Sequence, residues 1–88
     1  MIQDFGNCGH INKMLRIMKA FRVAQENKCA LVVVLDPLCY DSKPLRISSE
    51  DLTEVTMAYD KDTLYISVHN VVKFKLPWWD IVKVSVVW

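Results

Sequence analysis

The spacing of apolar residues changes once along this chain, and that change limits the possible folds more than any other feature. Before Lys28, apolar side chains recur every three or four residues, which is the period of one face of an α-helix. After Lys28, they alternate with polar residues at the period of a β-strand. The pattern predicts an α+β fold, with an N-terminal helix followed by a small, strongly bent antiparallel sheet of about four or five strands.

An amphipathic helix is predicted from about Lys13 to Asn27. Asn12 is a suitable N-cap, because its side chain can accept hydrogen bonds from free backbone N–H groups of the first turn. Residues 1–12 contain both glycines of the chain, and we expect them to form an irregular arm. The apolar stripe of the helix consists of Met14, Ile17, Met18, Phe21 and Ala24.

Basic side chains cover the opposite face of the predicted helix, at Lys13, Arg16, Lys19 and Arg22. A solvated face is the simplest interpretation, and contact with phosphates or with an acidic partner is the alternative. The chain holds 11 basic and 10 acidic residues, for a formal net charge of +1. This balance gives no overall attraction to nucleic acid or to an acidic lipid surface, so neither is expected as a partner.

The strands are predicted from runs of branched and alternating residues. Leu31–Leu35 is apolar throughout and indicates a central strand covered on both faces. A loop follows over residues 38–51, which could be a binding loop and contains a short extended piece at Leu45–Ile47. Alternating segments come next, with a turn at Asp60–Asp62 and a break at Asn70: Val55–Tyr59, Leu64–Val68, Val72–Leu76 and Val82–Trp88.

The cysteine count and the apolar runs bear on the compartment. Cys8, Cys29 and Cys39 are an odd number, and no signal peptide precedes them, so we expect reduced thiols and a cytoplasmic location. Cys29 and Cys39 border an apolar run, where a free cysteine usually acts as a small buried hydrophobe. The longest apolar run is too short to cross a membrane. The length of 88 residues predicts one domain, spanning residues 1–88.

No local signature of a catalytic site is present, so we expect no enzyme activity and no cofactor. Cys8 and His10 could supply two zinc ligands, but a structural site needs four and no second pair follows. His69 is interpreted as an ordinary turn residue. Asp60, Asp62 and Asp80 lack the other ligands of a calcium loop and are also interpreted as turn residues.

Adjacent tryptophans follow Pro77, and neighbouring side chains at a strand corner must point in different directions. Packing of both rings is the simplest interpretation, but an exposed ring at Trp78 or Trp79 would be a strong anchor for a partner. The last predicted strand is apolar on both faces, whereas one helix covers only one side of a sheet. We therefore predict a protein-binding patch made of Trp78, Trp79, Val71, Ile81 and Val87.

Several segments resemble the SspB family of protease-delivery adaptors, over about Leu15 to Val86. They are Leu31–Val34 after the helix, Tyr65–Val68 as a strand, and Phe74–Pro77 leading into Trp78–Val82. The resemblance implies a leading helix and a small, strongly bent antiparallel sheet. It also implies a groove on the sheet for degradation-tagged peptides and a dimer formed through the helix. Family members recruit an unfoldase with a C-terminal tail, which is not expected here because the sequence ends at Trp88 within a predicted strand.

The function expected from these features is that of a non-catalytic protein-binding module, acting as an adaptor or inhibitor. Its partner would be another protein or a second copy of the chain, giving a homodimer. A chain of this kind would also suit a virus-encoded protein that blocks a host factor. The alternative is a small nucleic-acid-binding protein that uses the basic helix face and stacks bases on Trp78 or Trp79, near Lys73, Lys75 and Lys83.

Overall fold

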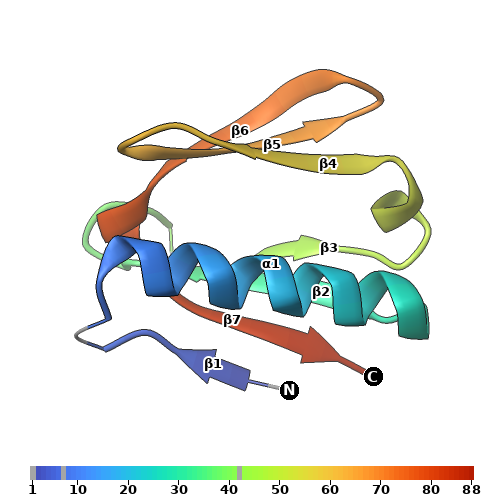
Figure 1. Ribbon diagram of the computed structural model, residues 1–88, viewed down its shortest axis with the longest axis horizontal. Coiled ribbons are helices and arrows are strands. Elements are labelled where there is room, and N and C mark those ends of the chain that lie inside the picture. The colour runs from blue at the N-terminus through green and yellow to red at the C-terminus, as the bar shows by residue number, and fades with distance from the viewer. Residues whose placement is uncertain (1, 7, 42) are drawn as a thin grey trace.

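Two antiparallel sheets and one long helix make up the structure, a computed structural model that describes residues 2–6, 8–41 and 43–88 (Figure 1). In chain order the elements are β1 (Ile2–Asp4), α1 (His10–Asn27), β2 (Ala30–Leu35), β3 (Leu45–Ile47), the 3-10 turn η1 (Asp51–Thr53), β4 (Val55–Tyr59), β5 (Thr63–Val68), β6 (Val71–Pro77), the 3-10 turn η2 (Trp78–Asp80) and β7 (Ile81–Val87). The α+β class is confirmed, with the helix ahead of most of the strands.

The strands divide between two sheets, where one bent sheet of four or five strands was predicted. A four-stranded sheet has the order β1-β7-β2-β3, and a three-stranded sheet has the order β4-β5-β6. All pairings are antiparallel. The chain passes between the sheets twice, from β3 to β4 through η1 and from β6 to β7 through η2, where Pro77 ends β6.

The N-terminal arm differs from its prediction. Ile2–Asp4 is not irregular but forms β1, which extends the four-stranded sheet by pairing with residues 83–85 of β7. A strand of three residues is too short to show alternation, so this long-range pairing left no sequence signal. The helix begins at His10 rather than at Lys13, and its N-cap is Gly9 in place of Asn12.

The C-terminal end of α1 has a well-formed cap. Lys28 adopts the left-handed conformation, with φ 55° and ψ 43°. The backbone N–H of Cys29 then donates to the Ala24 carbonyl at 2.9 Å, which gives the hydrogen bond of a Schellman motif. This cap turns the chain directly into β2, the central strand that the sequence predicted.

Two hairpins build the three-stranded sheet. The sequence predicted the turn at Asp60–Asp62 between β4 and β5, but only a break at Asn70, where the chain turns from β5 into β6. The β4–β5 turn is closed by hydrogen bonds in both directions between the backbones of Asp60 and Thr63. The β5–β6 turn has His69 at φ 53° and Asn70 at φ 64°. Two successive positive φ values match a type I′ turn, whose twist fits that of the flanking strands.

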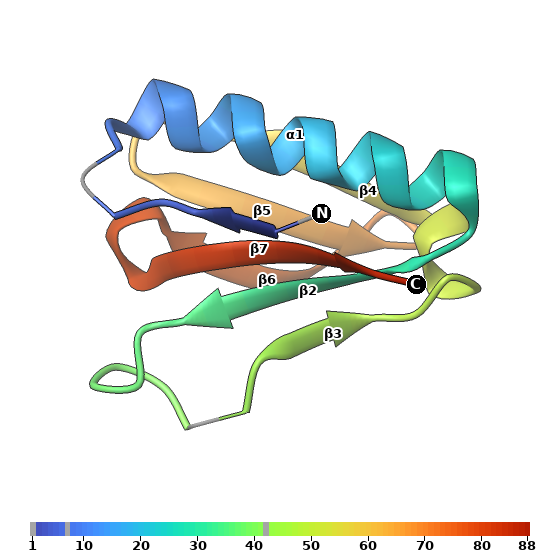
Figure 2. The same ribbon diagram turned by 90° about the horizontal axis from the view of Figure 1, so that it is seen from below.

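The helix and the two sheets enclose one core, as three sides of a prism (Figures 1 and 2). Its largest fully buried side chains are Phe5, Ile17, Leu31, Val33, Leu52, Leu64, Ile66, Ile81 and Val84. Helix α1 packs against β7 and β2 of the four-stranded sheet and covers one side of the space between the two sheets. The opposite side is bordered by β3 and β6, the last strands of their sheets.

We predict that Lys28→Gly stabilises the protein by about 0.5 to 1 kcal/mol, because glycine adopts the left-handed conformation without the steric strain of a Cβ atom. Urea unfolding monitored by circular dichroism measures the change. The matched control is Lys19→Gly at an exposed position inside α1, where glycine should cost about 1 kcal/mol. Destabilisation by both substitutions would contradict the role assigned to this cap.

Candidate functional site

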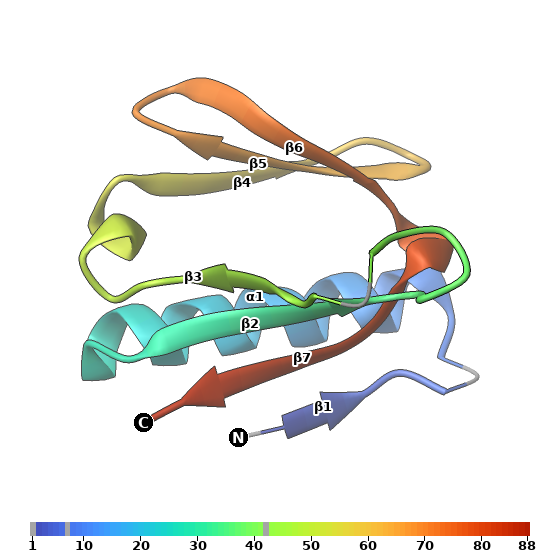
Figure 3. The ribbon, with the colours of Figure 1, turned by 180° about the vertical axis from the view of Figure 1, so that it is seen from behind.

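Strands β3 and β6 border the side of the molecule away from α1 (Figure 3). A groove lies between them. It consists of two adjoining cavities, of about 320 Å³ and about 460 Å³. Phe74 on β6 lines both cavities and is 36 % exposed. We call this feature the open groove, and its other lining residues are Leu35, Tyr40, Asp41, Lys43, Pro44, Leu45, Arg46, Ile47, Asp51, Val68, Lys73 and Leu76.

The floor of the open groove is apolar because β3 and β6 turn alternate side chains toward the core. Leu76 and Phe74 pair in register with Leu64 and Ile66, two buried residues of β5, so all four share the inner face. Ile47 on β3 is buried as well. Phe74 differs from its neighbours in that part of its ring remains uncovered. An uncovered aromatic ring in an apolar groove is a suitable contact for a partner.

A β-bulge places one more residue at the groove. Ile66 pairs with Phe74 and the next residue, Ser67, pairs with Val72, so Lys73 is an extra residue on β6. Bulges bend a strand and redirect its side chains, and they occur often near functional sites. Lys73 accordingly lines the groove together with Phe74.

The backbone on either side of the open groove is also unpaired. Within residues 2–6, 8–41 and 43–88, β3 pairs only with β2, and β6 pairs only with β5. The outer edge of each strand therefore presents free N–H and C=O groups, which can pair with an added strand. The groove thus combines an apolar floor with two hydrogen-bonding edges.

The loop before β3 is attached to η2 through Asp80. This aspartate is buried, its backbone carbonyl accepts a hydrogen bond from Asp36 N at 2.7 Å, and Tyr40 Oη donates to its Oδ2 at 3.2 Å. Burial, followed by this contact with Asp80, raises the pKa of the Tyr40 hydroxyl above its ordinary value. Asp80 was interpreted only as a turn residue, but its side chain holds Tyr40 at one end of the open groove.

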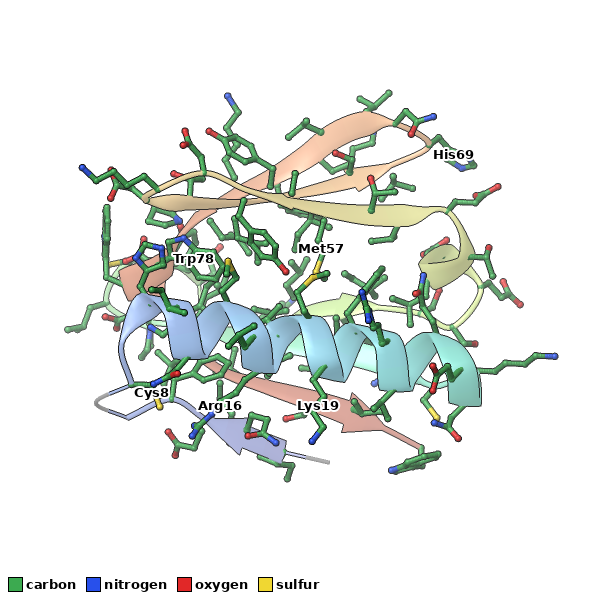
Figure 4. The ribbon with its side chains drawn as sticks, in the orientation of Figure 1. Cys8, Arg16, Lys19, Met57, His69 and Trp78 are labelled. Atoms are coloured by element: carbon green, nitrogen blue, oxygen red, sulfur yellow. The ribbon has the colours of Figure 1, made fainter. Side chains whose placement is uncertain are left out.

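The two tryptophans predicted as binding residues have different environments. Trp78 is 3 % exposed, and its ring stacks on His10 and Tyr59 with centroid distances of 5.5 and 5.6 Å (Figure 4). Its indole Nε1–H donates to the Asp60 carbonyl at 3.3 Å. Trp79 is 66 % exposed and borders a smaller cavity of about 210 Å³. Trp78 is therefore a core residue, and only Trp79 is available to a partner.

The other predicted patch residues do not form one surface with Trp79. Ile81 is 1 % exposed, so its assignment to an exposed patch was wrong: the turn at η2 directs it into the core. Val87 is partly exposed at the end of β7, beside a different cavity near Trp88. Val71 is exposed and pairs in register with Val68, which lines the open groove. Of the five predicted residues, Val71 is thus the one next to the groove.

The predicted basic face of the helix is partly used within the fold. Lys13 Nζ donates to the Trp78 carbonyl at 2.8 Å, and burial lowers the pKa of this amine. Arg16 donates to the Asp4 carbonyl at 3.3 Å and points toward β1 (Figure 4). Lys19 and Arg22 are exposed. The four cations therefore do not act as one uniform surface for phosphates.

The cysteines and histidines occupy separate places. Cys29 is buried as predicted, whereas Cys39 is exposed, because the chain has already left β2 for a turn. A hydrogen bond with Asp80, more than any other cause, raises the pKa of the Cys39 thiol. His69 contacts Glu54 at 2.8 Å at the far end of the three-stranded sheet (Figure 4).

Neither a metal site nor a membrane helix is found in the parts of the chain that the structure describes. No group of three or more His, Cys, Asp or Glu side chains in residues 2–6, 8–41 and 43–88 is arranged to hold a metal ion. In the same ranges, no helix combines the length and the apolar character needed to cross a membrane.

We predict that alanine substitution of the two tryptophans has very different effects on stability in thermal and urea unfolding. Trp78→Ala should lower the free energy of unfolding by about 3 to 5 kcal/mol, because it empties a buried site and breaks the stack. Trp79→Ala should change it by less than about 0.5 kcal/mol. Trp78→Phe, which keeps a ring for the stack but loses the indole N–H, should fall between them. Equal losses for Trp78→Ala and Trp79→Ala would contradict the assignment.

Comparison with protein-family models, with curated proteins and with solved structures gave no match for this chain. The resemblance to the SspB family therefore stays a prediction, and the open groove is the feature of this structure that bears most directly on function.

Proposed function

We propose that this chain is a non-catalytic protein-binding module that takes up an extended segment of another protein in the open groove. One observation carries the proposal: a partly exposed phenylalanine, Phe74, lies in an apolar groove bordered by two strands with unpaired edges. Strand addition uses both properties, because backbone hydrogen bonds provide affinity while pockets for alternate side chains provide specificity.

The charges at the rim favour an acidic partner. Lys43, Arg46 and Lys73 line the open groove, and none of them forms an ion pair with a described residue. Of the two aspartates in the groove, Asp51 already accepts a hydrogen bond from Ser48 Oγ at 3.0 Å. A segment with apolar residues at alternate positions and acidic residues between them would match both the floor and the rim.

Holding a segment of another protein is the work of an adaptor or of an inhibitor, and the groove is suited to both. The resemblance to SspB supports this use, since members of that family hold peptides in a groove on their sheet. The buried position of Trp78 and the engaged cations Lys13 and Arg16 make the alternative, binding of nucleic acid, the weaker one.

Selection from a random peptide library tests the proposal. We expect selected peptides to alternate apolar and acidic residues. Phe74→Ala should weaken their binding about thirtyfold, the effect of losing a buried aromatic anchor of about 2 kcal/mol. Hydrogen exchange should show new protection of the β6 amides that point away from β5.

Val72→Ala is the matched control, because Val72 is exposed on the same strand but pairs in register with Ser67, one position from Ile66 of the inner face. This control should leave peptide affinity unchanged, and thermal unfolding of each variant shows whether it is folded. Sedimentation of the wild type measures self-association separately. Peptides that lose affinity with Val72→Ala but not with Phe74→Ala would show that the open groove is not the site.

A further inference from the structure

A second apolar cavity, of about 440 Å³, lies on the other side of the molecule, between α1 and β4. We call it the α1–β4 cavity. Helix α1 supplies Met14, Leu15, Met18 and Val23 to its walls, and β4 supplies Tyr59. Its volume is in the range of sites that bind small molecules. Flexible methionine side chains adapt to the shape of an aliphatic ligand.

The hydroxyl of Tyr59 is an unused donor in the wall of this cavity. Its oxygen is buried and has no hydrogen-bond partner among residues 2–6, 8–41 and 43–88. The ring cannot easily turn the hydroxyl elsewhere, because it stacks on Trp78 at 5.6 Å. Burial raises the pKa of Tyr59, although the charge of Arg22 acts in the opposite direction. The hydroxyl is therefore protonated at neutral pH, and an acceptor on a ligand would satisfy it.

Positive charge borders the same cavity. Arg22 and Lys19 belong to its lining, both are exposed, and neither forms an ion pair with a described residue. The Lys19 amine points away from β4, towards β1 and β7 (Figure 4). Arg22 is the cation whose charge acts on Tyr59, so an anionic group at this point would face Arg22 and the Tyr59 donor together. A carboxylate suits this arrangement, because it accepts hydrogen bonds on two oxygens and is ionised at neutral pH.

We propose that the α1–β4 cavity binds a medium-chain aliphatic carboxylate. The chain lies along Met14, Met18 and Val23, and the carboxylate accepts a hydrogen bond from the Tyr59 hydroxyl and faces Arg22. This binding is separate from the peptide binding proposed for the open groove, since the two sites share no residue.

Isothermal titration of the full chain with octanoate, decanoate and dodecanoate, below their micelle concentrations, tests the chemistry of the ligand. Affinity should rise about fourfold for each added methylene until the chain fills the cavity. Decanol and decyltrimethylammonium have the same alkyl chain without the negative charge. They should bind at least about tenfold more weakly than decanoate, because charge-assisted hydrogen bonds are the stronger ones.

Two pairs of variants test the position of the carboxylate. Tyr59→Phe should weaken the binding of decanoate about tenfold. In thermal unfolding this variant should be at least as stable as the wild type, because it loses only an unpaired hydroxyl. Its control is Tyr65→Phe, since Tyr65 pairs with Ala58 on the outer face of the sheet. Arg22→Gln should also weaken decanoate, with Arg46→Gln on β3 as its control.

The inference would be overturned by equal affinities for decanoate and decanol, by unchanged binding of decanoate by both Tyr59→Phe and Arg22→Gln, or by the absence of decanoate binding below its micelle concentration. Because Arg46 belongs to the open groove, weaker decanoate binding by Arg46→Gln alone would also overturn it, by placing the ligand there.

Discussion

The packing of Trp78 is the interaction on which the arrangement of the three layers depends. The ring lies between His10, at the start of α1, and Tyr59, at the end of β4. The Trp78 backbone N–H donates to the Asp62 carbonyl at 3.2 Å, and the Trp78 carbonyl accepts from Lys13. One residue thus joins the helix, the three-stranded sheet and the turn that leads into the four-stranded sheet. No other described side chain makes stacking contacts with two elements in this way.

Trp78 joins the layers at one end, and the space between the two sheets still has two long sides that need a cover. The chain has only one long helix to provide it. A helix covers one stripe of apolar surface, so α1 covers the side where it packs against β7 and β2, and the side between β3 and β6 stays open. The expectation of surplus apolar surface came from the final strand. The final strand turns Ile81, Val84 and Val86 into the core and leaves Val82 and Val87 exposed, as expected. Exposed apolar side chains are also found on β6, at Val71, Val72 and Phe74. The open groove thus exists because one helix cannot cover both sides of the space between two sheets.

Local elements could be predicted from the sequence, and their assembly could not. The helix, the hairpin at Asp60–Asp62 and the short strand Leu45–Ile47 follow from patterns within a few residues. The pairing of β1 with β7 depends on segments at opposite ends of the chain. Alternation shows which residues share a face but not which face is inward, so the patterns of Ile81 and Val71 look alike although one is buried and the other exposed. The open groove brings together Tyr40, in the loop between β2 and β3, and Phe74 on β6, which no local pattern indicates.

The charges along the open groove serve the fold and its proposed use at once. An unpaired strand edge invites pairing with another copy of the same chain, and lysine is one of the residues that prevent it. Antiparallel pairing of β6 with a second β6 would bring the cations Lys73 and Lys75 of both copies together, which is unfavourable. An acidic segment meets no such repulsion and gains from the same charges. The residues that protect this edge from self-association are therefore those that would select a partner of opposite charge.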